Sequence, residues 1–182
     1  LVGSEMCIRD SACRQTGFAM LAETNPQEVM DLSPVAHLAA LEGKVPFINF
    51  FDGFRTSHEI QKIEKWDYED LKEMCNMDAV EEFRQHALNP EHPAMRGSHE
   101  NGDVFFQHRE ACNPVYDALP AVVEKYMGKV NEKLGTDYDL FNYYGAEDAD
   151  RVIIAMGSIC DVAEEVIDYL TAKGEKVGLI KV

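Results

Sequence analysis

Apolar and amphipathic runs divide the first third of the chain into a strand, a helix and a second strand. Residues 17–22 and 45–51 are short apolar runs of the length of buried strands. Residues 26–43 between them have apolar side chains at three-to-four spacing, typical of a helix that lies on a sheet. These side chains are Val29, Leu32, Ala36, Ala39 and Ala40. Strand, helix and strand with short connections indicate a parallel α/β sheet.

The predicted helix has clear signals at both ends. Asn25 is a suitable N-cap, and Pro26 follows at the first helical position, where a missing N–H is harmless. Glu28 has the charge that the helix dipole favours there. Pro34 is expected to kink or divide the helix, and Gly43 to end it.

The middle of the chain predicts mostly helices. Residues 67–74 and 78–88 have the pattern of two short acidic amphipathic helices, and residues 89–102 contain two prolines and two glycines typical of a loop. Residues 103–106 are expected to be extended. A longer helix is predicted over residues 120–134, with Val122, Val123, Tyr126, Val130 and Leu134 on one face and with breaks at Asn113-Pro114 and Leu119-Pro120 before it.

A second unit is predicted after residues 135–150, which have aromatic residues without helical period and an acidic cluster. Residues 151–156 are expected to be a buried strand, residues 161–173 an amphipathic helix ended by Gly174, and residues 177–182 the next strand. This pattern is one βαβ unit, expected to be right-handed.

Composition narrows the possible functions. The 182 residues include 33 acidic and 17 basic ones, a formal charge of −16. Nucleic acids and anionic membranes are therefore unfavoured partners, because both require a concentrated basic face. No run approaches the ~20 apolar residues of a membrane span. The five cysteines are scattered without a C-x-x-C pair, which suits the reducing cytoplasm and provides no framework for a metal.

Neither end is expected to be that of a complete protein. Residues 1–11 (LVGSEMCIRDS) lack an initiator Met and any period, and they resemble a translated sequencing adapter. We therefore exclude them from the functional argument. The chain ends on a predicted strand that should continue into another element. Together these features suggest an internal piece of a larger α/β enzyme.

Short motifs are weak in this chain. Gly157-Ser158 lies at a strand-to-helix turn and could present N–H groups to a phosphate, but the glycine-rich fingerprints are absent and a geometric role is favoured. His58-Glu59 is not part of H-E-x-x-H, and the other histidines lack ligand spacing. No metal site is therefore expected, and no G-x-S-x-G nucleophile elbow occurs.

The densest polar segment follows the second predicted strand, at the edge where open α/β sheets bind ligands. Arg55, Thr56, His58 and Glu59 lie within it, beside three phenylalanines and Asp52. Arg55 could clamp a carboxylate or pair with Asp52 or Glu59. The alternative, a loop buried at a domain or subunit interface, has equal weight. These four residues are candidates for a cofactor cleft or for an interface.

Several longer blocks closely resemble the pyruvate:ferredoxin (flavodoxin) oxidoreductase family. They are residues 12–22 (ACRQTGFAMLA), 45–63 (VPFINFFDGFRTSHEIQKI), 89–93 (NPEHP), 109–114 (REACNP) and 151–158 (RVIIAMGS). The resemblance implies a pyrimidine-binding-type thiamine domain, of which residues 12–138 are the later part. Residues 139–182 would begin a transketolase-C-terminal-like domain.

The resemblance also implies the activity. Family members are homodimers that convert pyruvate and coenzyme A to acetyl-CoA and CO₂ in anaerobic metabolism. They use thiamine diphosphate, Mg²⁺ and [4Fe–4S] clusters and reduce ferredoxin or flavodoxin. The residues that contact pyruvate and the aminopyrimidine belong upstream of Ala12, and the diphosphate site and cluster cysteines belong downstream. This piece is therefore expected to bind no cofactor alone and to be inactive alone. A related 2-oxoacid oxidoreductase and a non-catalytic α/β interaction module are the alternatives.

Overall fold

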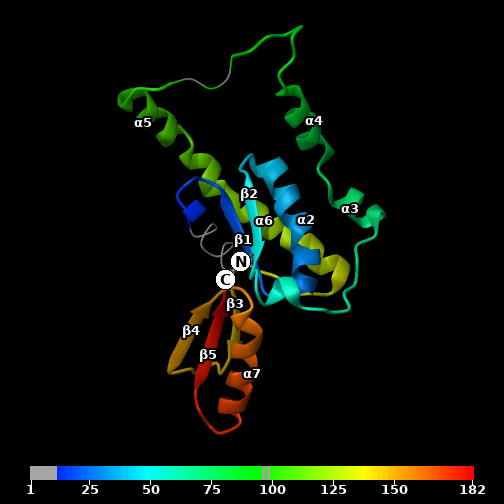
Figure 1. Ribbon diagram of the computed structural model, residues 1–182, viewed down its shortest axis with the longest axis vertical. Coiled ribbons are helices and arrows are strands. Elements are labelled where there is room, and N and C mark those ends of the chain that lie inside the picture. The colour runs from blue at the N-terminus through cyan, green and yellow to red at the C-terminus, as the bar shows by residue number, and fades with distance from the viewer. Residues whose placement is uncertain (1–11, 96, 98) are drawn as a thin grey trace.

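A computed structural model describes residues 12–95, 97 and 99–182. The adapter-like residues 1–11 lie outside the described residues. The helices and strands form two lobes, each built on its own small sheet (Figure 1). The first lobe extends to α6, and the second contains β3, β4, α7 and β5.

The sheet of the first lobe is the predicted parallel pair. β1 (Ala19–Glu23) pairs with β2 (Phe47–Phe51) from Ala19↔Phe47 to Glu23↔Phe51. The connecting helix α2 (Pro26–Gly43) packs against both strands. The strand–helix–strand prediction is confirmed.

Helix α2 begins as its sequence predicts. Asn25 is the N-cap, and its side chain accepts hydrogen bonds from the N–H groups of Gln27 and Glu28 at 3.1 and 3.0 Å. At its other end the helix stops at Gly43, after which Lys44 has a left-handed φ of 56°. Pro34 does not divide the helix, which runs through it. Leu32 and Val35 beside it are buried, so packing outweighs the missing hydrogen bond.

Helix α6 (Asn113–Leu134) lies along α2 and contributes most of the remaining core. The prediction that it starts at Pro120 is wrong, because it begins seven residues earlier and contains Pro120. Leu119 and Val123 on either side of this proline are buried, and their packing keeps the backbone helical. Leu134, expected on the buried face, is 39% exposed.

A long excursion joins β2 to α6. It contains the 3₁₀ turn η1 (Thr56–His58), α3 (Tyr68–Met74), α4 (Met77–Gln85) and α5 (Gly102–Ala111). The extended segment predicted at residues 103–106 is wrong, since it lies inside α5. Among the described residues no strand pairs with it, and a helix satisfies the backbone N–H and C=O groups internally.

A carboxylate network ties α2, α4 and α6 together. Glu42 accepts hydrogen bonds from Lys125 at 2.6 and 2.9 Å, from the Tyr126 hydroxyl at 2.6 Å and from Asn76 at 3.1 Å. The hydrogen bonds from Lys125 and Tyr126 lower the pKa of Glu42 to about 2. Tyr126 itself is 1% exposed, so this network reaches the core.

The second lobe contains a three-stranded sheet in the order β3-β5-β4. β4 (Arg151–Ala155), α7 (Ile159–Thr171) and β5 (Val177–Lys181) form the predicted parallel βαβ unit. β3 (Asn142–Gly145) adds an antiparallel strand that sequence patterns missed. It has only four residues, and its partner lies more than 30 residues later.

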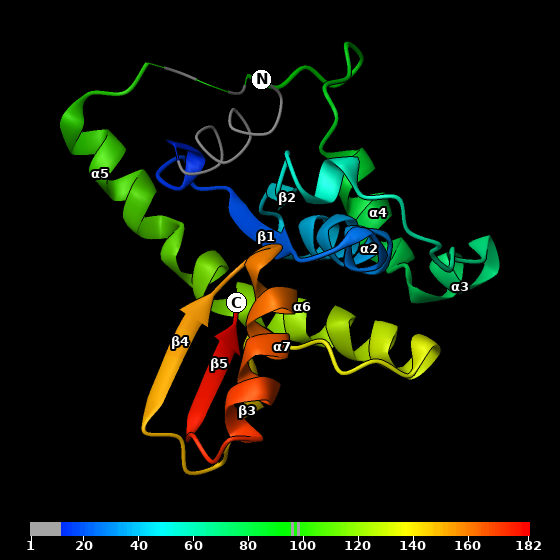
Figure 2. The ribbon, with the colours of Figure 1, turned by 60° about the horizontal axis from the view of Figure 1, so that its bottom comes forward.

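Strand β4 is not buried, contrary to the prediction. Ile153 and Ile154 are 61% and 70% exposed. The reason is the position of β4 at the edge of the sheet, while α7 packs over β5 and β3 (Figure 2). No helix in the described part of the chain has the length and apolar run of a membrane span.

Candidate functional site

A large cavity lies between the two lobes and is the candidate site. Its volume is about 1120 Å³, and its lining is mostly apolar. The walls come from β1, α2, β2, α6, the segment 136–144 and the end of β5. The cavity thus lies at the carboxyl end of β5 and beside β1 and β2, at the kind of strand edge where α/β sheets bind ligands.

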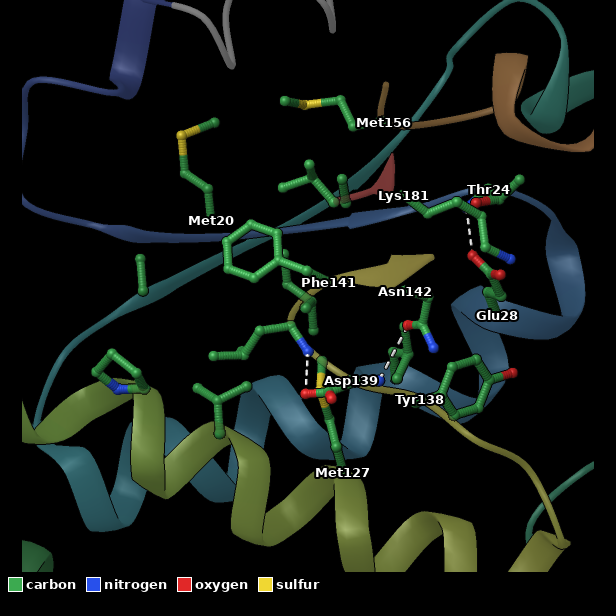
Figure 3. Close-up of a pocket in the computed structure, with 18 of the residues that line it drawn as sticks. Met20, Thr24, Glu28, Met127, Tyr138, Asp139, Phe141, Asn142, Met156 and Lys181 are labelled. Atoms are coloured by element: carbon green, nitrogen blue, oxygen red, sulfur yellow. Dashed lines mark hydrogen bonds between the residues drawn. The ribbon is translucent and has the colours of Figure 1, made fainter. Parts of the chain in front are cut away.

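The cavity has an apolar side and a charged side. Figure 3 shows Met20, Phe141 and Met156 on one side, and Thr24, Glu28 and Lys181 on the other. Such a lining with few polar groups is typical of small-molecule sites, where the polar groups fix orientation.

The charged side is built from the ends of α2 and β5. Glu28 Oε2 accepts a hydrogen bond from the Thr24 N–H at 2.7 Å. Lys181 Nζ pairs with Glu164 Oε1 of α7 at 2.7 Å. Burial lowers the pKa of Lys181, but the hydrogen bond to Glu164 and the negative charges of Glu164 and Glu28 outweigh this effect and raise it above the ordinary value. Lys181 therefore remains a cation facing the carboxylate of the other lobe.

The segment between the lobes forms a second wall of the cavity, and hydrogen bonds hold it to the first lobe. The Asn131 side chain accepts from the Tyr138 N–H and donates to the Tyr138 carbonyl, both at 2.8 Å. The Tyr138 hydroxyl donates to the buried Asp31 carboxylate at 2.9 Å. Burial and this hydrogen bond raise the pKa of Tyr138, which stays neutral. The wall is therefore fixed to α2 and α6.

A buried carboxyl group lies at the end of β1. Glu23 is 0% exposed, and neither of its oxygens has a hydrogen-bond partner among the described residues. Burial, with the charge of Glu28 adding to it, raises the pKa of Glu23 to about 9. Glu23 is therefore a protonated acid at neutral pH.

The turn before α7 binds a carboxylate from the other lobe. Asp52 Oδ2, just past β2, accepts a hydrogen bond from the Ser158 N–H at 2.7 Å. The sequence suggested only weakly that the Gly157-Ser158 turn binds a phosphate. In the structure, the anion at this turn is the carboxylate of Asp52. A helix N-terminus favours such a negative charge.

The four predicted site residues lie in different environments in the structure. Thr56 is buried, and its hydroxyl donates to the Thr24 carbonyl at 3.1 Å, which ties the loop to the end of β1. Arg55, His58 and Glu59 are exposed. None of the four lines the cavity described here. Their role in a cofactor cleft or dimer interface stays a prediction.

The sequence patterns did not point to the charged residues that line the cavity. Glu28 was noted only for its helix, and Lys181 was not singled out. The available signal was position, because both lie within a few residues of a strand's carboxyl end. Two such ends from separate sheets cannot be matched without the tertiary structure.

Among the described residues, the cavity offers few charged partners for the diphosphate end of a thiamine cofactor. That end binds through a divalent cation that needs several oxygen ligands. In the described part of the chain, no three His, Cys, Asp or Glu side chains gather as a metal site. The basic side chains at the cavity are Arg14 and Lys181, and Lys181 pairs with Glu164.

Comparisons with known proteins agree across the chain. A family model described as "Pyruvate flavodoxin/ferredoxin oxidoreductase, thiamine diP-bdg" matches residues 10–128, and one described as "Pyruvate:ferredoxin oxidoreductase core domain II" matches residues 149–182. The chain is 61% identical to a pyruvate-flavodoxin oxidoreductase of Enterobacter agglomerans and 60% to one of Klebsiella pneumoniae. It is 58% identical to a pyruvate:ferredoxin oxidoreductase of Moorella thermoacetica. Each match covers 94% of this chain and about 15% of the relative's length.

Proposed function

Since the chain belongs to the pyruvate flavodoxin/ferredoxin oxidoreductase family, we propose that it is an internal part of an enzyme that oxidises pyruvate. In this reaction pyruvate and coenzyme A give acetyl-CoA and CO₂, and the two electrons reduce flavodoxin or ferredoxin. The observation that carries the proposal is the match of two family models in order, with 61% identity over 171 residues.

The proposal assigns most of the chemistry to other parts of the longer protein. Thiamine diphosphate is the cofactor of the whole enzyme, and its Mg²⁺ and the [4Fe–4S] clusters would bind outside the described residues. Such a cofactor stabilises the carbanion formed on decarboxylation, and the protein supplies orientation and electrostatics. The described residues supply the scaffold and one cavity. We expect the 182-residue chain to have no turnover by itself.

The proposed domain arrangement follows from the two sheets. Residues 12–138 would be the later part of the pyrimidine-binding-type domain, and residues 139–182 the start of a transketolase-C-terminal-like domain. β3 lies after residue 139 and pairs with β5, which supports a division before it. We also propose that the enzyme is a cytoplasmic homodimer.

The direct test is an assay of the full-length protein that contains this chain. Purified under anoxic conditions, it should reduce flavodoxin or ferredoxin only when pyruvate, coenzyme A and thiamine diphosphate are all present. Faster reduction with another 2-oxoacid would favour the related-oxidoreductase alternative. Absence of reduction with every 2-oxoacid, in protein reconstituted with cofactor and clusters, would favour a non-catalytic α/β module.

The polar loop after β2 can be tested in the same enzyme. We propose that Arg55, Thr56, His58 and Glu59 serve a cofactor cleft or the dimer interface. Arg55→Ala should then lower the specific activity or weaken the dimer measured by sedimentation. Arg84→Ala, which removes another exposed arginine, on α4, is the control. Wild-type activity and dimer stability in the Arg55 variant would contradict this role.

A further inference from the structure

The contact between Asp52 and α7 joins two parts of the chain that are far apart in sequence. The hydrogen bond from the Ser158 N–H to Asp52 Oδ2 spans 106 positions. Ser158 is the N-cap of α7, and its own side chain makes no capping hydrogen bond. The carboxylate of the first lobe therefore satisfies an N–H group at the start of α7 that has no partner within the helix.

Gly157 makes this contact possible. Its φ of 77° lies in the left-handed region that residues with a side chain rarely adopt. A Cβ at this position would lie 3.0 Å from Asp52 Oδ2. The carboxylate thus lies directly against the backbone of the turn, and both the backbone conformation and the close approach require glycine.

Asp52 is also held firmly within its own lobe. The Asp52 carbonyl accepts a hydrogen bond from the Ser57 N–H at 3.1 Å, which closes the turn after β2. Thr56 in that turn is buried and donates to the Thr24 carbonyl. A shift of Asp52 would therefore strain the ends of both β1 and β2.

A second attraction acts across the same junction. Lys181 at the end of β5 is influenced by the negative charge of Glu28 at the start of α2. Both side chains line the cavity, as do Asp52 and Met156. The Asp52 contact at α7 and the attraction between Lys181 and Glu28 thus both lie at the cavity between the lobes.

We infer that Asp52 is a clamp that fixes the second lobe on the first by capping α7, and that it thereby sets the opening of the cavity between them. It is a positioning residue rather than a catalytic one. This inference concerns the geometry of the chain and does not rest on the proposed reaction.

The experiment measures the distance between the lobes. Spin labels are placed on cysteines introduced at Glu132 of α6 and Glu165 of α7, both exposed, after the five cysteines of the chain are changed to alanine. Electron–electron double resonance then gives the distribution of label distances. A held orientation gives one narrow distribution, and Asp52→Ala should broaden it by about twofold or more.

Two further variants isolate the contact. Ser158→Pro removes the N–H donor, and the Ser158 φ of −62° already suits proline. It should broaden the distribution as much as Asp52→Ala, and the double variant should broaden it no further. Asp117→Ala, which removes an exposed aspartate of α6, is the matched control and should match the unsubstituted chain.

The possible results distinguish lobe movement from unfolding. Circular dichroism must show the same helix content in every variant, so that a wider distribution reports lobe movement and not unfolding. If Asp52→Ala fails to fold, Ser158→Pro provides the test by itself. An unchanged distribution in the folded variants would overturn the inference, whatever the activity of the full-length enzyme.

Discussion

Replacement of Glu23 by glutamine is expected to stabilise the protein at neutral pH. Glu23 has an ordinary pKa of 4.5 when exposed and about 9 in the folded chain. Between these values the folded state binds one more proton than the unfolded state, so stability falls as the pH rises. Each pH unit above 4.5 removes about 1.4 kcal/mol, which amounts to about 3 kcal/mol at pH 7.

Glutamine has nearly the same shape and never ionises. Like the protonated carboxyl, its amide has a donor, and Asn49 Oδ1 nearby is a buried acceptor. Burial of the amide costs about 1–2 kcal/mol, so the net gain at pH 7 should be about 2 kcal/mol. Since the gain comes from removing a titration, it should shrink towards pH 5 and increase towards pH 8.5.

Urea unfolding at several pH values tests this reasoning. The unsubstituted chain should lose about 1.4 kcal/mol of unfolding free energy per pH unit more than the Glu23→Gln variant does. Glu59→Gln, an exposed glutamate changed in the same way, should leave the pH dependence as it was. Parallel pH profiles for the two proteins would show that Glu23 titrates normally and would refute the argument.

The remaining predictions concern the α2–α6 contact and the helix ends. Glu42→Gln weakens its bonds to α6 and should lower the unfolding free energy by about 2 kcal/mol at pH 7. Because its folded pKa is about 2, this loss should fade from pH 4.5 towards pH 2, and a constant loss would contradict it. Gly43→Ala places a Cβ 2.6 Å from Leu119 Cδ1 and should lower the unfolding free energy by about 1–3 kcal/mol. Leu119→Ala in the same chain should partly relieve this clash. Additive effects of the two changes would argue against the clash. Asn25→Ala should cost about 1 kcal/mol in thermal unfolding, whereas Asn101→Ala, an N-cap whose side chain makes no capping bond, should be neutral; equal losses would exclude the capping explanation.

The local predictions succeeded where neighbouring residues contain the whole signal. Asn25 and Pro26 set the start of α2 through capping and backbone conformation, which depend on a few adjacent residues. The helix ends at Gly43 as predicted, but the left-handed residue that ends it is Lys44. The prolines at positions 34 and 120 led to wrong predictions of helix breaks, because each lies inside a continuous helix. Their effect on a helix is local, but the packing that keeps each helix continuous comes from distant residues.

The candidate site could be predicted only in part. The sequence places polar residues after β2, and in the structure Asp52 and Thr56 make contacts there with other segments. The sequence could not show that Asp52 meets α7, since the chain between them contains seven other elements. The exposure of β4 was equally hidden, because an apolar run indicates a strand but not its place in the sheet.

The sequence by itself determined the elements of both βαβ units and the family, because periodicity, caps and long residue blocks are properties of the chain order. The tertiary structure alone decided how those units meet. It brings the ends of β1, β2 and β5 to one cavity, buries Glu23 without a partner among the described residues and sets Asp52 against α7. The physical reason is that burial and long-range electrostatics depend on which distant surfaces come together, and residue spacing contains no record of that.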